Sequence, residues 1–131
     1  MISVQKVERH MLKVVLVALV SLASCSSVDD GYIIGTWQAV QVKEEGDPLP
    51  INVEEISFTF QDNEAYHYES TLNYREAGSY YIEGNYLYTT DTVNQGSMEK
   101  AVEIITLSED SLQLKMDEKG KERIIHLGKR K

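Results

Sequence analysis

The sequence of 131 residues contains few of the residues that reinforce or interrupt a fold: one cysteine, two prolines and one tryptophan. A single cysteine cannot form a disulfide within the chain, so a packed core has to hold the fold together. Basic residues are also scarce, because 13 lysines and arginines face 21 aspartates and glutamates, for a net charge of −8. Such an acidic chain is a poor partner for nucleic acid, whose phosphates attract basic side chains.

Sequence motifs for catalysis, metal binding and phosphate binding are absent as well. His67 shares a strand face with Glu69, a pair that could form part of a metal or acid–base site, but a solvent-facing polar surface is the simpler interpretation. His126 lies between Ile125 and Leu127 and could face the interior of the fold. Acid–base catalysis needs a second positioned group beside the first. We therefore expect no enzyme, no metal site and no cofactor.

The first 24 residues have the three parts of a secretory signal sequence. A basic region precedes an apolar run at residues 14–20, and small residues follow it. The uncharged stretch 14–24 is well short of the roughly 20 residues that a membrane-spanning helix needs. Met11 could be the initiator instead of Met1, because M-L-K followed by the same apolar run is already a complete short signal.

Cys25 directly follows Leu-Ala-Ser at residues 22–24, a run that resembles the bacterial lipobox. This pattern predicts cleavage before Cys25 and a lipid on its thiol, with several acyl chains anchoring the protein stably in a membrane. A secreted protein cleaved elsewhere is the alternative. Ser26 favours the outer membrane, and Asp29 and Asp30 resemble the acidic tract of surface-exposed lipoproteins. We expect an outer-membrane lipoprotein on the periplasmic or the cell-surface side.

The mature chain, residues 25–131, is long enough for one compact domain but not for two. We expect a removed signal peptide at 1–24, a lipidated tether at 25–32 and one domain at 33–131. Without the signal, 10 basic and 20 acidic residues remain, a net charge of −10. This acidity is expected to keep a membrane-tethered domain in solution.

Period-two alternation of apolar and polar residues, interrupted by turn residues, predicts eight β-strands. In the second of them Ile56, Phe58 and Phe60 share one face. Residues 44–50 are expected to form a loop, because their two prolines and glycine do not fit a central strand, and residues 51–55 could add a short helical turn. The predicted strands are 35–43, 55–61, 64–73, 78–83, 86–90, 99–107, 112–117 and 122–129.

Short connections between these strands favour sequential antiparallel pairing, an up-and-down meander. A flat meander would leave two long unpaired edges and one uncovered face, whereas pairing the first strand with the eighth removes both problems. We therefore predict an all-β, eight-stranded antiparallel barrel. An open sheet and a two-sheet sandwich are the alternatives.

Gly35-Thr36-Trp37 opens the first predicted strand, and the segments I-S-F-T-F-Q-D-N, G-S-Y-Y-I-E-G-N-Y-L-Y and I-T-L-S-E-D-S-L-Q-L follow it in order. This series resembles the small lipocalin-like (calycin-type) lipoproteins of Bacteroidota over nearly all of the mature chain. The resemblance implies that Gly35 and Trp37 close one end of the barrel and that a late basic residue stacks over the tryptophan. Arg130 is our candidate for that residue, with Lys129 as the alternative.

Seven of the eight tyrosines lie between residues 66 and 88. On period two, Tyr66, Tyr68, Tyr80 and less clearly Tyr74 point one way, while the other set points the opposite way (Tyr81, Tyr86 and Tyr88). Cross-strand packing is one interpretation, at roughly 0.5–1.5 kcal/mol for each aromatic pair. A lining for an amphipathic ligand is another, and the outward set could form a protein contact, where tyrosine is enriched.

An eight-stranded barrel has just enough interior for its own side chains or for one small ligand. Its expected inward residues are large (Trp37, Ile56, Phe58, Phe60, Tyr66, Tyr68, Tyr80, Ile82, Leu87, Ile104, Leu112, Leu114 and Met116), whereas Ala39, Ser70 and Thr89 are smaller. We predict a narrow or partly blocked cup with residues 44–55 as a lid over its mouth, by analogy with the long first loop of lipocalins. The ligand-binding candidates are Phe58, Phe60, Tyr66, Tyr68, Tyr80 and His126.

These features together predict a non-enzymatic, lipid-anchored barrel of the cell envelope. It would bind a small hydrophobic or amphipathic molecule in its cup. The alternative is a protein-interaction module, such as an inhibitor, an immunity protein or an accessory subunit. Such a module would engage another envelope protein through its outer face or its loops.

Overall fold

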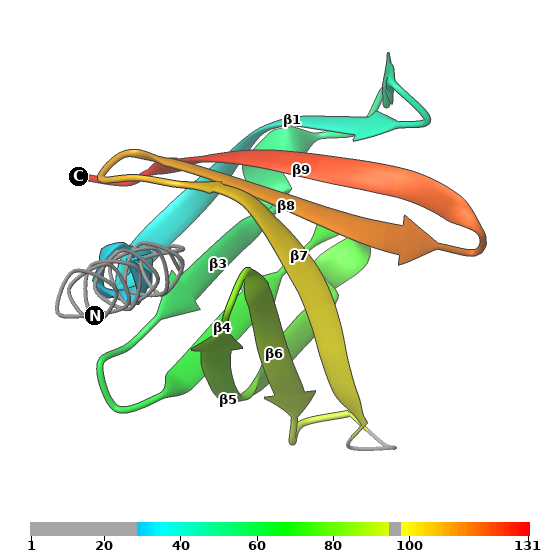
Figure 1. The fold of residues 1–131 in the computed structure, drawn as a ribbon. Coiled ribbons are helices and arrows are strands. Elements are labelled where there is room, and N and C mark those ends of the chain that lie inside the picture. Colours follow the sequence, from blue (N-terminus) through cyan, green and yellow to red (C-terminus); the bar gives the residue numbers. More distant parts are fainter. Residues whose placement is uncertain (1–28, 95–97) are drawn as a thin grey trace, which may run out of the picture.

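The computed structural model describes residues 29–94 and 98–131. The predicted signal peptide, Cys25 and the first part of the tether lie outside the described residues. Within the described ranges, no helix is long and apolar enough to cross a membrane. The described part of the chain consists of strands and three short 3₁₀ turns (Figure 1).

The strands follow the predicted rhythm closely. They are β1 (Gly35–Glu44), β2 (Asp47–Pro48), β3 (Ser57–Phe60), β4 (Ala65–Glu69), β5 (Arg75–Glu83), β6 (Tyr86–Asp91), β7 (Glu99–Leu107), β8 (Ser111–Glu118) and β9 (Lys121–Lys129). The 3₁₀ turns are η1 (Asp30–Ile33), η2 (Val53–Glu55) and η3 (Thr71–Asn73). The helical turn expected in the first long loop is therefore confirmed as η2.

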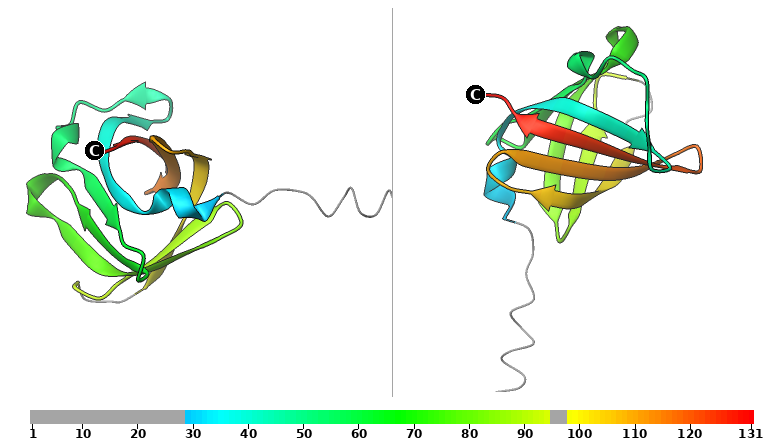
Figure 2. Two further views of the ribbon diagram at one scale, coloured as in Figure 1. Left: turned by 90° about the vertical axis from the view of Figure 1, so that its left-hand side faces the viewer. Right: turned by 90° about the horizontal axis from the view of Figure 1, so that it is seen from above.

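Eight of the strands form a closed antiparallel barrel, as predicted. Each strand from β3 to β8 pairs with the next one along the chain, and β1 pairs with both β3 and β9. The closing β1–β9 ladder runs from Trp37 opposite Lys129 to Glu44 opposite Arg123. Viewed from the side of the termini, the strands form a ring (Figure 2). The barrel thus has the meander order in which no long strand remains at an open edge of the sheet.

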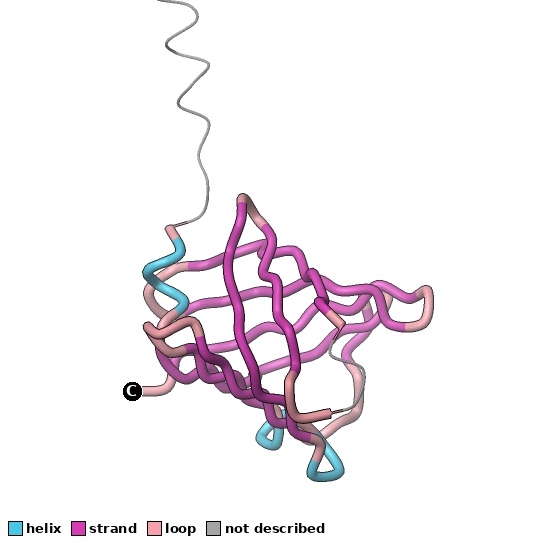
Figure 3. The backbone as a smooth tube through the Cα atoms, turned by 90° about the horizontal axis from the view of Figure 1, so that it is seen from below, coloured by secondary structure: helices cyan, strands magenta, loops and turns pink. Residues whose placement is uncertain are grey.

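The two ends of the barrel differ. At the end that we call the closed end lie η1, the C-terminus and the turns after β3, β5 and β7. At the opposite, open end lie the segment between β1 and β3, the η3 turn, the loop after β6 and the β8–β9 turn. Figure 3 shows η1 near the C-terminus, and η2 and η3 close together away from it.

The barrel interior is filled by the apolar face of the strands. All of the predicted inward residues are buried or pack against the buried cluster, and the structure adds Ile33, Val42, Ile125 and Leu127. Since side chains alternate across a strand, the same alternation that predicted the strands also identifies the core. The largest of the fully buried side chains are Trp37, Tyr66 and Phe60.

Trp37 closes that end, as the family resemblance implies. Its side chain is fully buried, and its indole Nε1 donates a hydrogen bond of 2.7 Å to the carbonyl oxygen of Ile33. The Lys129 ammonium lies 5.1 Å from the centroid of the indole ring and donates a 3.0 Å hydrogen bond to the carbonyl of Tyr32. A cation over an aromatic face is a favourable contact.

The prediction that Arg130 covers the tryptophan is wrong, because Lys129 does so. Lys129 is the direct cross-strand partner of Trp37, so the next residue points to the other face of the sheet. Arg130 is exposed there and bonds to the side chain of Gln38. Gly35 has a φ of 134°, and a Cβ at this position would lie 2.6 Å from Cε of Lys129. A glycine at this position thus leaves room for the lysine stem.

Three predicted boundaries were wrong, all next to a 3₁₀ turn. The second strand begins at Ser57 because η2 occupies residues 53–55, and the third ends at Glu69 because η3 follows it. Within η3, Leu72 and Asn73 have left-handed φ angles of 60° and 59°. Such angles interrupt a strand, and Leu72 is almost fully exposed. The fourth strand consequently starts at Arg75, three residues earlier than predicted.

The segment 44–50 is not a simple loop as predicted, since it contains the two-residue strand β2. Asp47 and Pro48 pair with Glu44 and Lys43, and the Leu49 amide donates to the carbonyl of Val42 at 2.8 Å. Proline is tolerated because β2 lies at an edge, where its missing N–H is not needed. The short strand covers an edge of β1 that β3 does not reach, because β3 pairs only with residues 35–38 of β1.

On the opposite side of the barrel, β7 and β8 separate towards the open end (Figure 1). Their ladder reaches Glu103 opposite Lys115 and goes no further. Residues 99–102 of β7 pair only with β6, and residues 116–118 of β8 pair only with β9, among the residues that the structure describes. The barrel wall therefore has a lateral split at its open end.

Candidate functional site

A pocket of about 680 Å³ opens at the open end of the barrel and reaches the split between β7 and β8. Every strand from β3 to β9 contributes to it, with Tyr74 directly before β5. Its lining residues are Phe58, Tyr66, Tyr68, Tyr74, Glu76, Leu87, Thr89, Lys100, Ala101, Val102, Leu114, Met116, Asp117, Glu118, Arg123 and Ile125. Its volume lies within the range of roughly 300–1,000 Å³ that is typical of small-molecule sites.

Much of the pocket surface is apolar and aromatic. Phe58 and Tyr68 stack across β3 and β4 with their ring centroids 4.4 Å apart, and Tyr74 meets Tyr68 edge-on at 6.0 Å. Buried Leu87, Leu114 and Ile125 lie among the other lining residues. Flat rings beside branched aliphatic groups suit an apolar molecule or the apolar face of an amphipathic one.

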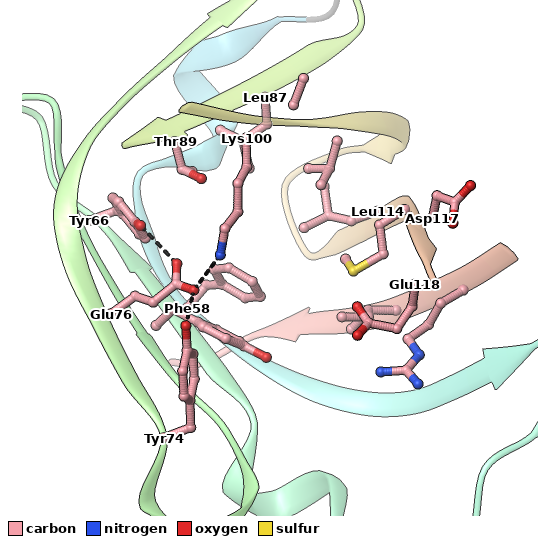
Figure 4. Close-up of a pocket in the computed structure, with 16 residues that line it drawn as sticks. Phe58, Tyr66, Tyr74, Glu76, Leu87, Thr89, Lys100, Leu114, Asp117 and Glu118 are labelled. Carbon is pink, nitrogen blue, oxygen red and sulfur yellow. Dashed lines mark hydrogen bonds and ion pairs between the residues drawn. The ribbon is translucent and has the colours of Figure 1, made fainter. Parts of the chain in front are cut away.

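One wall of the pocket holds a buried carboxylate, Glu76, which is 7% exposed. The Tyr66 hydroxyl donates to its Oε1 at 2.9 Å, and the Tyr74 hydroxyl donates to its Oε2 at 2.6 Å. The Lys100 ammonium donates to the same Oε2 at 2.7 Å. Figure 4 shows Lys100 extending from its strand so that its nitrogen meets the carboxylate. The three donors come from β4, β7 and the residue before β5.

This cluster changes the titration of its members. Burial opposes ionisation of Glu76 most strongly, but the hydrogen bonds from Lys100, Tyr74 and Tyr66 together outweigh it and lower the pKa of the carboxyl below its usual 4.5. The hydrogen bond to Glu76, with some burial, raises the pKa of Tyr74 to about 12. Burial and then Glu76 raise the pKa of Tyr66. The site therefore contains a carboxylate that is ionised at neutral pH, beside protonated phenols.

A second charged group lies at the mouth. Arg123 of β9 donates from Nη2 to Glu44 of β1 at 3.1 Å, while its Nε is buried without a hydrogen-bond partner among the described residues. Asp117 and Glu118 line the side of the pocket opposite Glu76 (Figure 4). The carboxylate of Asp117 accepts a 2.7 Å hydrogen bond from the Gly120 amide in the β8–β9 turn. The mouth is thus more acidic than basic.

The structure brings three of the ligand-binding candidates together in the pocket: Phe58, Tyr66 and Tyr68. Phe60 and Tyr80 are buried in the core instead, with their rings edge-on at 5.0 Å, and the Tyr80 hydroxyl donates to the carbonyl of Gln61 at 2.8 Å. They lie towards the closed end, where β3 and β5 end. These two residues support the pocket but do not line it.

His126 does not face the lumen. Its neighbours Ile125 and Leu127 are buried inside the barrel, so alternation places His126 on the outer face, next to Gln113 and Ser111 of β8. His67 and Glu69 are exposed, which agrees with the solvent-facing interpretation. No group of three metal-ligating side chains is found within residues 29–94 and 98–131.

The segment 44–55 does not act as the predicted lid. Its first residue, Glu44, binds Arg123. The chain then pairs with β1 as β2 and enters η2. None of the residues 44–55 lines the pocket. Leu49 and Val53 pack instead against the core. The Gln38 amide helps to hold it in place by donating to the carbonyl oxygens of Val53, Glu54 and Ile56.

Sequence reasoning missed the polar residues of the pocket: Glu76, Lys100 and Arg123. A usable signal was present for all three. Glu76 alternates in step with the inward residues Tyr80 and Ile82, and Lys100 with Val102 and Ile104. Arg123 alternates in step with Ile125 and Leu127. A charged residue in an inward phase indicates a buried ion pair. Because the fourth strand was predicted to start at residue 78, Glu76 belonged to no predicted strand and its inward position was missed.

Comparison with known proteins gives a consistent picture. The family model described as a lipocalin-like domain matches residues 33–114. The fold is similar to the crystal structure of a lipocalin-like protein from Bacteroides uniformis, with a TM-score of 0.58 and 17% identity, over 76% of this chain and 100% of that one. It is also similar to an uncharacterized protein from Bacteroides eggerthii, with a TM-score of 0.53 and 13% identity, over 74% and 98% of the two chains. No curated protein matches the chain in sequence.

Proposed function

Because the chain belongs to the lipocalin-like domain family, we propose that it is a non-enzymatic binding protein of the cell envelope. It holds one small amphipathic or hydrophobic molecule in the pocket at its open end, and a lipid on Cys25 anchors it in the outer membrane. The observation that carries the proposal is the pocket of about 680 Å³ inside a barrel whose other end is tightly filled. A barrel that served only as a scaffold would gain stability by filling this space.

The surface of the pocket supports an amphipathic ligand more than a purely apolar one. The stacked rings of Phe58 and Tyr68 and the aliphatic groups beside them would contact the apolar part of the ligand. The charged groups at Glu76 and Arg123 lie on its walls and at its mouth. A few placed polar groups in an otherwise apolar pocket commonly orient a ligand.

The position of the N-terminal segment fits anchoring through Cys25. The described chain begins beside η1, at the closed end, and the pocket opens at the other end. A lipid at the end of the tether would therefore leave the mouth facing away from the membrane. In this arrangement the ligand would exchange with the aqueous side or with a partner protein, without passing through the lipid.

A matched pair of variants on β6 tests the binding function. Thr89 lines the pocket, whereas its neighbour Thr90 does not. We expect native mass spectrometry of the purified mature domain to reveal a co-purifying small molecule. Thr89→Trp should remove that molecule by filling the pocket, and Thr90→Trp should retain it. Retention in both variants, with both folded by circular dichroism, would contradict binding in this pocket.

A specific observation keeps the protein-interaction module as a second candidate. Tyr81, Tyr86 and Tyr88 form a row on the outer face of β5 and β6, with Tyr81 stacked on Tyr88 at 4.7 Å and Tyr86 6.4 Å from Tyr88. Tyr81 and Tyr86 are more than 40% exposed. If this row contacts a protein, pull-down from intact cells should return a stoichiometric partner that Tyr81→Ser with Tyr86→Ser abolishes. A ligand carrier alone should return none.

A further inference from the structure

The Glu76 carboxylate is surrounded by groups that would suit a bound cation. A buried carboxylate is costly unless it is paired and hydrogen-bonded. Here two of its donors, the Tyr66 and Tyr74 hydroxyls, are neutral, and only Lys100 brings a positive charge. The structure therefore contains a preformed anionic position inside the pocket, and an alkyl ammonium group occupies it.

Lys100 is poorly held in that position. Its side chain remains 57% exposed, in contrast to 7% for Glu76. It also arises from residues 99–102 of β7, the part of the strand that has lost β8 as a neighbour. Lys100 can therefore swing out through the split, while Tyr66 and Tyr74 remain in place on the other wall. The buried carboxylate would not lose its ionic partner in this exchange, because the ammonium group of the ligand would replace that of Lys100.

The surroundings of the carboxylate match an amine with an apolar body. Phe58 and Tyr68 offer stacked ring faces, and Tyr74 lies edge-on to Tyr68. Aromatic faces attract an ammonium group, and aliphatic lining accepts its hydrocarbon part. The Lys100 side chain is itself a hydrocarbon stem that ends in an ammonium group.

Charge around the pocket points the same way. The lining contains three carboxylates, at Glu76, Asp117 and Glu118, against two cationic groups. One of these two, Arg123, is already paired with Glu44. The full chain carries a net charge of −8. The summed potential of such a surface attracts cations to the mouth and repels anions.

We propose that Glu76, Tyr66 and Tyr74 form a subsite for the protonated amine of an amphipathic ligand, and that Lys100 occupies this subsite until the ligand displaces it. The inference rests on the proposed function and specifies its ligand class. It distinguishes this pocket from one that uses Lys100 to bind a carboxylate. The two possibilities predict opposite effects when Lys100 loses its charge.

Calorimetric titration of the mature domain at pH 7 with octylamine, octanol and octanoate tests the proposal. We expect octylamine to bind most tightly. Lys100→Met removes the competing ammonium and keeps an unbranched stem, so it should tighten octylamine binding about twofold to fivefold. Glu76→Gln should weaken it at least about tenfold, because a charge-assisted hydrogen bond is lost. Lys115→Met is the control, since Lys115 pairs with Glu103 outside the pocket at 3.9 Å and should change nothing.

Weaker octylamine binding by Lys100→Met, or tighter binding of octanoate than of octylamine by the unmodified domain, would overturn the amine subsite while leaving the proposed function intact. Failure of all three compounds to bind would overturn both. If Glu76→Gln does not fold, Lys100→Met still decides between the two possibilities, because they predict changes of opposite sign in its affinity for octylamine.

Discussion

Glu76 shows how a single residue links the stability of the barrel to its pocket. Its carboxylate is buried and accepts hydrogen bonds from three side chains. Removing the carboxylate would leave these donors, two of them phenols, without their acceptor. Ligand binding and acid stability should therefore respond to the same side chain.

The lowered pKa of Glu76 predicts how stability depends on pH. Because the folded-state pKa lies below the ordinary value of 4.5, the ionised carboxylate stabilises the fold above that value. Its contribution is lost as the pH falls through the folded-state pKa. Urea unfolding at a series of pH values should show a steeper loss of stability below about pH 4.5 for the natural domain than for Glu76→Gln. Equal slopes for the two proteins would contradict the assigned hydrogen bonds.

At the same scale, the sequence identifies apolar residues better than polar ones. Phe58, Tyr66 and Tyr68 are predicted on the inward face and lie in the pocket. His126 was wrongly predicted to face the interior, between Ile125 and Leu127. Adjacent residues of a strand point to opposite faces, so two inward neighbours place His126 on the outer face. The exchange of Arg130 for Lys129 is a one-residue difference in register. Such differences depend on the pairing of distant strands.

Among the elements, β7 and β8 differ in stability along their length. Their shared ladder ends at Glu103 and Lys115, so residues 99–102 and 116–118 each lack one neighbour. Fewer hydrogen bonds and less packing make local opening easier. We expect amide hydrogen exchange to be more than about tenfold faster on average in these segments than in residues 103–107 and 111–115, a difference of about 1.4 kcal/mol in opening free energy.

A complementary outcome tests the role of the split. If the pocket fills through it, a bound ligand should slow exchange in residues 99–102 and 116–118 and leave β3 unchanged. Uniform protection of all strands would indicate that β7 and β8 do not separate in solution. The comparison needs no substitution, so it reports on the natural domain.

The strand pattern is the level at which sequence-based prediction works best here. All eight barrel strands were predicted, and the ends of β7 are those expected. The largest boundary errors lie around η3, where no glycine or proline marks the turn. Leu72 in η3 adopts a left-handed conformation, although leucine rarely does so. Prediction therefore extended the third strand through this position.

For the whole molecule, β9 is the strand that closes the barrel. It pairs with β8 and β1 at once and contributes Ile125 and Leu127 to the core. The match to the family model ends at residue 114, before this strand begins. Closure is thus supplied by a strand that lies beyond the segment matched by the family model.

Removing β9 should therefore prevent folding. Loss of two buried aliphatic side chains alone costs about 3–6 kcal/mol, and typical domains are stable by only about 5–15 kcal/mol. We expect a domain that ends at Glu118 to lack a cooperative thermal transition by circular dichroism. A domain that ends at Lys129 should keep the transition, because Trp37 still has its cross-strand partner. Cooperative unfolding of the shorter chain would contradict a closed barrel.

The sequence by itself determines the strand order, the inward face of each strand, the plugging tryptophan and the predicted lipid site at Cys25. These depend on local periodicity and on short motifs, which neighbouring residues specify. The tertiary structure alone decides which strands separate, which residue covers Trp37 and how Glu76, Lys100 and Tyr74 meet. Such contacts join residues on different strands, and their geometry depends on register and closure, which only the assembled barrel sets.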